Sequence, residues 1–225
     1  ENESVENVTV NLSGQSTGTV NTTANGAYAF TVIQAGNDVT VTPEKDDDQL
    51  NGVTTYDLVL ISKHILNIET LDSPYKMIAA DVNNSKSITT FDLVELRKLV
   101  LFINTEFPNN SSWRFVASSY VFPVPTDPWA EPFPEIISIN NIPVDVLDAD
   151  FVAVKIGDVN NSSGFAGGES GERSSRPLVF ETKNLAMVAG ATYRLDFNAR
   201  DFEVEGYQFT LEFDSELLDF VEVVP

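Results

Sequence analysis

The chain has 225 residues, of which 42% are hydrophobic, so it is long and apolar enough for one to three globular domains. It carries 34 acidic and 13 basic residues, and this net charge of −21 excludes proteins that neutralise nucleic-acid phosphates or anionic membrane surfaces. The absence of cysteine excludes disulfides, thiolate zinc sites and cysteine nucleophiles. The excess of acids is explained either by solubility through self-repulsion or by cation binding. Cation binding is favoured only where the acids occur at a defined spacing. The chain opens at Glu1 without a signal peptide and has no apolar run of membrane-spanning length, so we expect a mature product or a fragment with no membrane insertion.

Residues 1–45 are predicted to form a small β-sandwich. Val8–Leu12 alternates apolar and polar side chains, and Ala27–Val32 and Val39–Thr42 are rich in aromatic and β-branched residues. The pair Asn25-Gly26 is typical of a turn between two such segments. Three strands are therefore expected in this part of the chain.

Residues 46–103 change to helical periodicity and contain an internal repeat. Apolar residues recur at helical spacing over residues 58–66 and again over residues 93–101. Thr54–Val59 matches Thr89–Val94 at five of six positions, and the sixth is an exchange of Tyr for Phe. Each predicted helix follows an acidic loop rich in Asn and Ser, so the repeated unit is a loop followed by a helix.

The second copy has the ligand spacing of a calcium loop. Oxygen-bearing side chains occupy loop positions one, three and five, position seven can offer its carbonyl, and position twelve is an acid. Calcium binds six to eight such hard oxygens, and this spacing lets a short loop curl around one ion. The predicted ligands are Asp81, Asn83, Ser85, Ser87 and Asp92.

The first copy fits the same pattern less well. Its predicted ligands are Asp46, Asp48, Gly52 and Asp57, whereas Leu50 at position five has no side-chain oxygen. Position six of such loops usually needs a positive φ, which Asn51 tolerates and which would cost Lys86 of the second copy about 1 kcal/mol or more. We therefore expect two unequal calcium sites.

Two alternatives accompany this prediction. Asp57 and Asp92 are also placed to cap helices, although capping does not explain the acids eleven residues upstream. In addition, Asp158–Ser162 repeats Asp81–Ser85 letter for letter, and Glu169 falls at its position twelve. This third fragment, with Asp158 and Asn160 as its side-chain ligands, is open to two interpretations, a third calcium site or a polar turn.

The remaining sequence divides into three parts. Residues 104–161 are rich in Pro and aromatic residues, and we expect them to wrap over the two helices with Trp113 and Trp129 as apolar anchors, the alternative being an ordinary surface insertion. Residues 162–176 have the composition of a flexible linker. Residues 177–225 return to strand patterns, at 178–180, 193–197 and 207–213, which are too few for a complete sandwich.

His64, the only histidine, is interpreted as a helix-face residue without a catalytic role.

The repeat resembles a type I dockerin, and the second copy resembles it more closely. The resemblance implies that residues 46–161 contain two antiparallel loop-helix units that bind a cohesin-type partner. The recognition residues it implies are Thr55, Tyr56, Ser62 and Lys63 in the first copy and Thr90, Phe91, Arg97 and Lys98 in the second. Leu50, Lys86 and the insertion after Asn104 depart from the family pattern.

The flanking segments carry weaker resemblances. Residues 1–45, through Thr22–Phe30, resemble a carboxypeptidase-regulatory or Cna B-type β-sandwich. Residues 177–225, through Ala189–Tyr193 and Gly206–Leu211, resemble the first strands of a cohesin-type sandwich. This order is similar to that of secreted, multidomain surface proteins of Bacteroidota exported by the type IX system.

The sequence thus predicts an α+β multidomain chain that is not an enzyme. We expect a calcium-binding structural, adhesive or scaffolding segment of a secreted cell-surface protein. Its partner would be a cohesin-like domain or a neighbouring copy of the same protein, and head-to-tail association would give filament-like assembly. The alternative is an accessory, dockerin-bearing region of a secreted carbohydrate-active hydrolase, whose catalytic domain would lie elsewhere.

Overall fold

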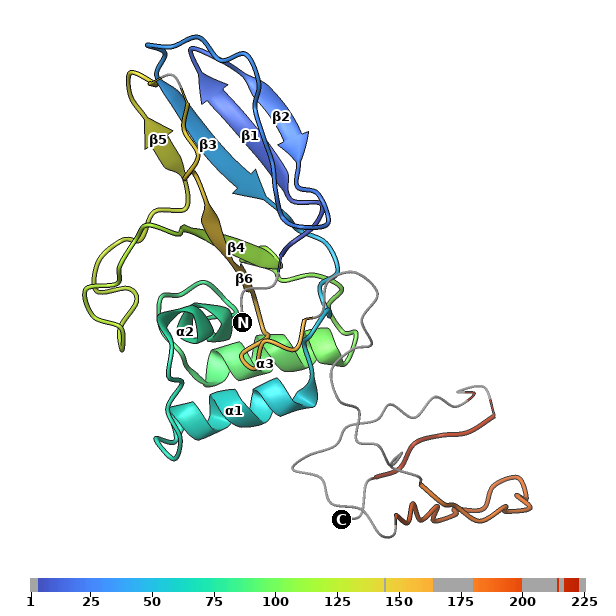
Figure 1. Cartoon of the computed structure of the whole chain (residues 1–225). Helices are drawn as coiled ribbons and strands as arrows, with labels where there is room; N and C mark the ends of the chain where they lie inside the picture. Colours follow the sequence, from blue (N-terminus) through green and yellow to red (C-terminus); the bar gives the residue numbers. More distant parts are fainter. Residues whose placement is uncertain (1–3, 144, 164–179, 200–213, 215–216, 223–225) are drawn as a thin grey trace.

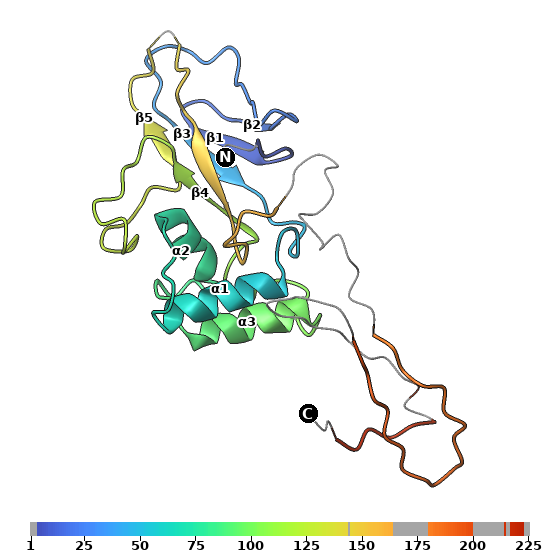
Figure 2. The ribbon, with the colours of Figure 1, turned by 60° about the horizontal axis from the view of Figure 1, so that its bottom comes forward.

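The computed structural model describes residues 4–143, 145–163, 180–199, 214 and 217–222. In these residues the chain is an α+β protein with three helices and two small antiparallel sheets (Figure 1). The four-stranded sheet lies at one end, the helices lie at the other, and a two-stranded sheet lies between them (Figures 1 and 2). The α+β class expected from the sequence is therefore confirmed.

The four-stranded sheet has the order β2-β1-β3-β5. It consists of β1 (Thr9–Gly14), β2 (Gly18–Asn21), β3 (Val39–Glu44) and β5 (Ile137–Ile139), all paired antiparallel. Alternate side chains of β1 and β3 are buried, which gives the sheet one apolar face and one more polar face. The strands predicted near residues 8–12 and 39–42 are thus confirmed, and a strand from the Pro/aromatic-rich segment completes this sheet.

The strand predicted over Ala27–Val32 is absent from the structure. Tyr28 and Phe30 still pack against the core of the sheet, and the Tyr28 hydroxyl donates to the carbonyl of Ala149. Both edges of β1 are already paired, one with β2 and one with β3. The alternating pattern therefore reflects side-chain packing here, since Tyr28 and Phe30 reach the core of the sheet although their backbone joins no strand.

The two predicted helices are α1 (Thr55–Ile65) and α3 (Thr90–Val100), and both are confirmed. They lie side by side and run in opposite directions (Figures 1 and 2). Each begins with a reciprocal capping box, in which a Thr hydroxyl accepts from the helix backbone and an Asp carboxylate accepts from the Thr backbone. A third helix, α2 (Pro74–Ala80), was not predicted, although Ser73 as N-cap and Pro74 at the first position are the usual start signals.

The two-stranded sheet joins the two halves of the fold. It pairs β4 (Trp113–Ala117) with β6 (Phe151–Lys155). Side chains on one face of this pair, Trp113 and Phe115 among them, pack into the core under the four-stranded sheet. Val116 and Val154 on the other face pack into the core between the helices. The β4–β6 pair therefore belongs to both cores.

The expectation for the Pro/aromatic-rich segment is correct for one anchor and wrong for the other. Trp129 packs against the helical core, as predicted. Trp113 is buried in the core of the four-stranded sheet, because strand alternation in β4 turns it away from the helices.

The C-terminal predictions fall mostly outside the described residues. Residues 164–176 of the predicted linker, the segment 178–179 and the segment 207–213 are not described. Residues 193–197, predicted as a strand, form no strand, and the described segment 180–199 contains an isolated antiparallel bridge between Glu181 and Asn198. No helix in the described ranges has the length and apolar character needed to cross a bilayer.

Candidate metal centre

The contiguous loop, residues 81–92, curls around the carboxylate of Asp81. The amides of Ser85 and Lys86 donate to Asp81 Oδ1 and Oδ2, both at 2.8 Å. The Ser85 amide also donates to Asn83 Oδ1 at 3.1 Å, and the Ser85 hydroxyl donates to the Ser87 carbonyl at 3.2 Å. All the oxygens predicted as ligands before position twelve are therefore gathered in one turn.

Asp92 closes this loop from the first turn of α3. Its Oδ1 accepts from the amide of Asn83 at 3.1 Å, and its Oδ2 accepts from the amide of Thr89 at 2.8 Å. Asp81 and Asp92 are both fully buried. Burial raises the pKa of Asp81, the amides of Ser85 and Lys86 lower it, and the negative charge of Asp92 raises it further, with a net increase. The contiguous loop therefore holds two buried carboxylates whose charges repel.

The first copy of the repeat is completed by a segment that lies far away in the sequence. Asp158–Ser162 makes the same hydrogen bonds as Asp81–Ser85. The amides of Ser162 and Ser163 donate to Asp158 Oδ1 and Oδ2 at 3.0 and 2.8 Å, and the Ser162 amide also donates to Asn160 Oδ1 at 3.1 Å. Asn84 and Asn161, at matching positions, both have a φ of 57°. The repeated letters therefore take up a repeated geometry.

The second half of this site comes from the start of α1. The Ser162 hydroxyl donates to the Gly52 carbonyl at 2.9 Å, as Ser85 does to the carbonyl of Ser87. The Val159 amide donates to Asp57 Oδ1 at 2.9 Å, and the Thr54 amide donates to Asp57 Oδ2 at 2.8 Å. We call residues 158–163 together with residues 52–57 the split loop. It presents the ligand set of the contiguous loop in two pieces.

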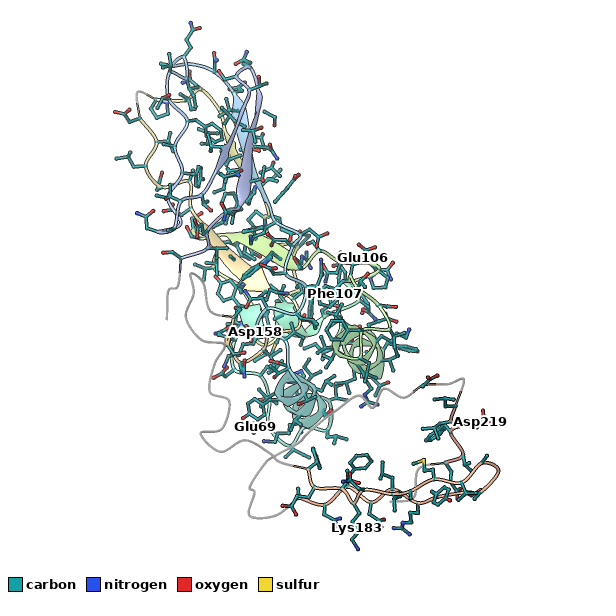
Figure 3. The ribbon with its side chains drawn as sticks, turned by 90° about the vertical axis from the view of Figure 1, so that its right-hand side faces the viewer. Glu69, Glu106, Phe107, Asp158, Lys183 and Asp219 are labelled. Atoms are coloured by element: carbon teal, nitrogen blue, oxygen red, sulfur yellow. The ribbon has the colours of Figure 1, made fainter. Side chains whose placement is uncertain are left out.

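The two acids of the split loop are as buried as their counterparts. Asp57 is fully buried and Asp158 is 2% exposed. Figure 3 labels Asp158 at the end of the β4–β6 pair that faces the helices. Burial raises the pKa of Asp57 to about 6, hydrogen bonds from Thr54 and Val159 lower it, and the charge of Asp158 raises it. The split loop therefore also holds two buried carboxylates that repel each other.

The structure places Asp46 and Asp48 away from this arrangement. Both are exposed, and Asp46 Oδ1 accepts from the Ser112 amide at 2.8 Å and from Gln49 Nε2 at 2.9 Å. Burial raises the pKa of Asp46, but the hydrogen bonds from Ser112 and Gln49 outweigh it, and the pKa is lowered overall. The positive φ values in this segment fall at Asp48 and Gly52, so residues 46–57 do not repeat the turn of residues 81–92.

A buried lysine lies beside these N-terminal acids. Lys155 is 4% exposed, and its ammonium group donates to the Gln49 carbonyl at 2.9 Å. The group also lies 5.6 Å from the ring centre of Phe107 (labelled in Figure 3) and 5.8 Å from that of Trp113. Burial lowers the pKa of Lys155 to about 8, although Asp158 and Asp46 raise it. Lys155 therefore places a positive charge of the chain itself near Asp158 of the split loop as well as near the acids at residues 46–48.

The donor sets fit calcium. Each loop offers two carboxylates, one Asn amide oxygen, one Ser hydroxyl and one backbone carbonyl, all hard oxygens, and water molecules would supply the remainder. Among the residues that the structure describes, no group of three His, Cys, Asp or Glu side chains converges. This composition disfavours zinc and the transition metals, which take nitrogen or sulfur ligands.

Asp158, Asn160 and Ser162 were not predicted as partners of the first copy. The signal was visible, since Asp158–Ser162 repeats Asp81–Ser85, but its second half was sought downstream at Glu169. Glu169 lies outside the described residues. His64 accepts a hydrogen bond from the Leu71 amide at 3.1 Å through Nδ1, and burial lowers its pKa, so it orders the turn after α1.

Comparison of the chain with protein-family models, curated proteins and solved structures finds no match. The interpretation of the site therefore depends on its own geometry and on the internal repeat.

Proposed function

We propose that this chain is a calcium-stabilised structural and docking segment of a secreted cell-surface protein, with one ion in the contiguous loop and one in the split loop. The observation that carries this proposal is the matched pair of oxygen sets, each with two buried aspartates. Buried carboxylates of like charge are costly without a cation, and a divalent ion between them converts the repulsion into attraction. Each bound ion would supply positive charge between the carboxylates and would be coordinated by the oxygens of its loop. This role involves no catalytic step.

The residues that would hold the ions are defined by the hydrogen-bonded turns. In the contiguous loop they are Asp81, Asn83, Ser85, Ser87 through its carbonyl, and Asp92. In the split loop they are Asp158, Asn160, Ser162, Gly52 through its carbonyl, and Asp57. The N-terminal acids Asp46 and Asp48 are not included, because they are exposed and Asp46 already binds Ser112.

Calorimetric titration of the metal-free chain tests this proposal. We expect two calcium ions per chain and a higher melting temperature in calcium than in EGTA, because ligands of the folded state stabilise it by mass action. Asp92→Ala should remove one ion, and Asp46→Ala is the matched control that should remove none. A melting temperature that is equal in calcium and chelator would exclude calcium as a structural component.

A docking role is supported by the outer surfaces of the two helices. Phe91 is 72% exposed and Tyr56 is 40% exposed, and these are equivalent positions of the repeat. Phe102 and Ile103, just after α3, are also exposed. The described part of the Pro/aromatic-rich segment leaves these side chains uncovered, and exposed aromatic residues are enriched in protein-protein interfaces. We propose a cohesin-like domain or a second copy of this chain as the partner.

The docking proposal is tested separately from calcium binding. Sedimentation velocity of the chain at increasing concentration, in calcium, should show association if a second copy is the partner. Phe91→Ser should weaken that association without changing the calcium stoichiometry. A chain that stays monomeric at all concentrations would exclude the second copy and leave the cohesin-like domain, which is tested by titration with such a domain.

A further inference from the structure

We infer that the split loop is a calcium-dependent latch that fastens residues 158–163 to the start of α1. The inference rests on the proposed function, since it requires an ion at this site. It adds that the two proposed calcium sites have different structural roles. The contiguous loop orders a turn within one stretch of chain, whereas the split loop joins two stretches that the sequence places far apart.

The contacts across the latch are few and polar. Val159 N donates to Asp57 Oδ1 and Ser162 Oγ donates to Gly52 O, and these bonds span 102 and 110 residues of the chain. Within residues 158–163, Val159 is the one apolar side chain, and it is 1% exposed. One buried valine and two direct hydrogen bonds therefore hold the segment against the repulsion of Asp57 and Asp158.

The chain just before the latch is held without a metal. Ile156 is fully buried in the helical core, and the Gly157 amide donates to the Ala79 carbonyl at 2.9 Å. The preceding strand, β6, pairs along its whole length with β4. Release of an ion from the split loop would therefore free residues 158–163 and leave β6 in place.

The split loop is packed closely enough for an ion to control it. A Cβ atom on Gly52 would lie 2.5 Å from Asp158 Oδ2, 2.5 Å from the Ser163 amide nitrogen and 2.7 Å from Ser163 Cα. The backbone of Gly52 and the carboxylate of Asp158 therefore lie close together across the two segments, where a side chain at residue 52 would not fit. A divalent cation that binds the Gly52 carbonyl and the Asp158 carboxylate would pull the segments together, whereas without it the negative charges of Asp57 and Asp158 repel and the charge of Lys155 offsets part of that of Asp158.

Amide hydrogen exchange measured by NMR on the full 225-residue chain tests the latch. The amides of Val159, Ser162 and Ser163 donate into the split loop, and those of Asn83, Ser85 and Lys86 donate into the contiguous loop. Calcium should slow exchange at both groups by about tenfold or more, because opening then requires release of the ion. In Asp158→Ala, calcium should slow only the contiguous-loop amides. In the matched variant Asp81→Ala, it should slow only the split-loop amides.

Calorimetry on the same samples separates the possible failures. Wild-type chain that binds no calcium would overturn both the proposed function and the latch. Two bound ions with unchanged exchange at Val159, Ser162 and Ser163 would overturn the latch alone. Loss of an ion in Asp46→Ala but not in Asp158→Ala would also overturn it, because the first site would then lie elsewhere. If Asp158→Ala does not fold, Asn160→Ala removes one ligand from an exposed position and should weaken calcium protection of the same three amides.

Discussion

The raised pKa of Asp57 predicts that the metal-free protein becomes more stable as the solution is acidified. Burial, the largest contribution, takes this pKa from 3.8 to about 6. At 1.36 kcal/mol for each tenfold change in proton affinity, this corresponds to about 3 kcal/mol. Between these two pH values the folded chain keeps a proton on Asp57 that the unfolded chain has lost. Stability from this group is therefore fully present below pH 3.8 and is lost as the pH rises to about 6.

Urea denaturation in metal-free buffer measures this effect, because urea adds no ionic screening. Asp57→Asn is the matched variant, since its amide cannot ionise and its oxygen can still accept from the Thr54 amide. We expect the free energy of unfolding of Asp57→Asn, relative to wild type, to fall by about 3 kcal/mol from pH 7.5 to pH 4. The subtraction removes the contributions of Asp81 and of the net charge, which also favour the folded state on acidification.

At neutral pH, saturating calcium should reverse the order of stability of wild type and Asp57→Asn. Wild type then has an ionised carboxylate that binds the ion, and Asp57→Asn has lost that charge, so the variant should be the less stable one. A stability difference that does not vary with pH in metal-free buffer would refute the reasoning, because it would mean that Asp57 ionises at the same pH in the folded and unfolded chains.

Three further predictions concern single substitutions. Gly157→Ala should cost about 3 kcal/mol in urea denaturation, because φ is +87° and the new Cβ would lie 2.7 Å from Leu96 Cδ1 and 3.1 Å from Val53 Cγ2. Trp113→Ala should cost about 4 kcal/mol, because its side chain is 3% exposed in the core of the four-stranded sheet. Gly52→Ala should weaken calcium binding at the proposed split-loop site in calorimetry and leave the other proposed site unchanged, because the nearest atoms to the new Cβ belong to Asp158 and Ser163 of the split loop.

The sequence predicted the helical half of the fold well because its signals are local. Thr54 and Thr89 each stand three residues before an acid and open an amphipathic segment, and both helices begin there. The contiguous loop was predicted residue by residue for the same reason, including the positive φ of Lys86, which is 64°. Asp92 also combines capping of α3 with closure of the loop, since it accepts from the Thr89 amide with one oxygen and from the Asn83 amide with the other.

The remainder depended on pairings between distant residues, which local patterns do not encode. The pairing of β3 with β5 joins residues about a hundred positions apart, and nothing near Ile137 in the sequence indicates it. Asp46 had the correct spacing to Asp57 but was drawn to the Ser112 amide instead. Once the structure is known, solvent exposure distinguishes the proposed ligand Asp57 from Asp46. Asp57 is buried and Asp46 is not, and burial is decided by the tertiary fold.

The difference in chain separation predicts that the two proposed calcium sites differ in their affinity for calcium in a partly folded chain. Asn83 and Asp92, which close the contiguous loop, are 9 residues apart, whereas Val159 and Asp57 are 102 residues apart. The entropic cost of closing a loop grows as (3/2)RT ln n, so the longer closure costs about 2 kcal/mol more. In the folded protein the β4–β6 pair already brings the distant segments together, whereas a destabilised chain must still lose this entropy when the split loop closes. In a calcium titration at intermediate urea, the contiguous loop should therefore become protected from amide exchange at lower calcium than the split loop. Equal calcium dependence of the two loops under those conditions would contradict a split first site.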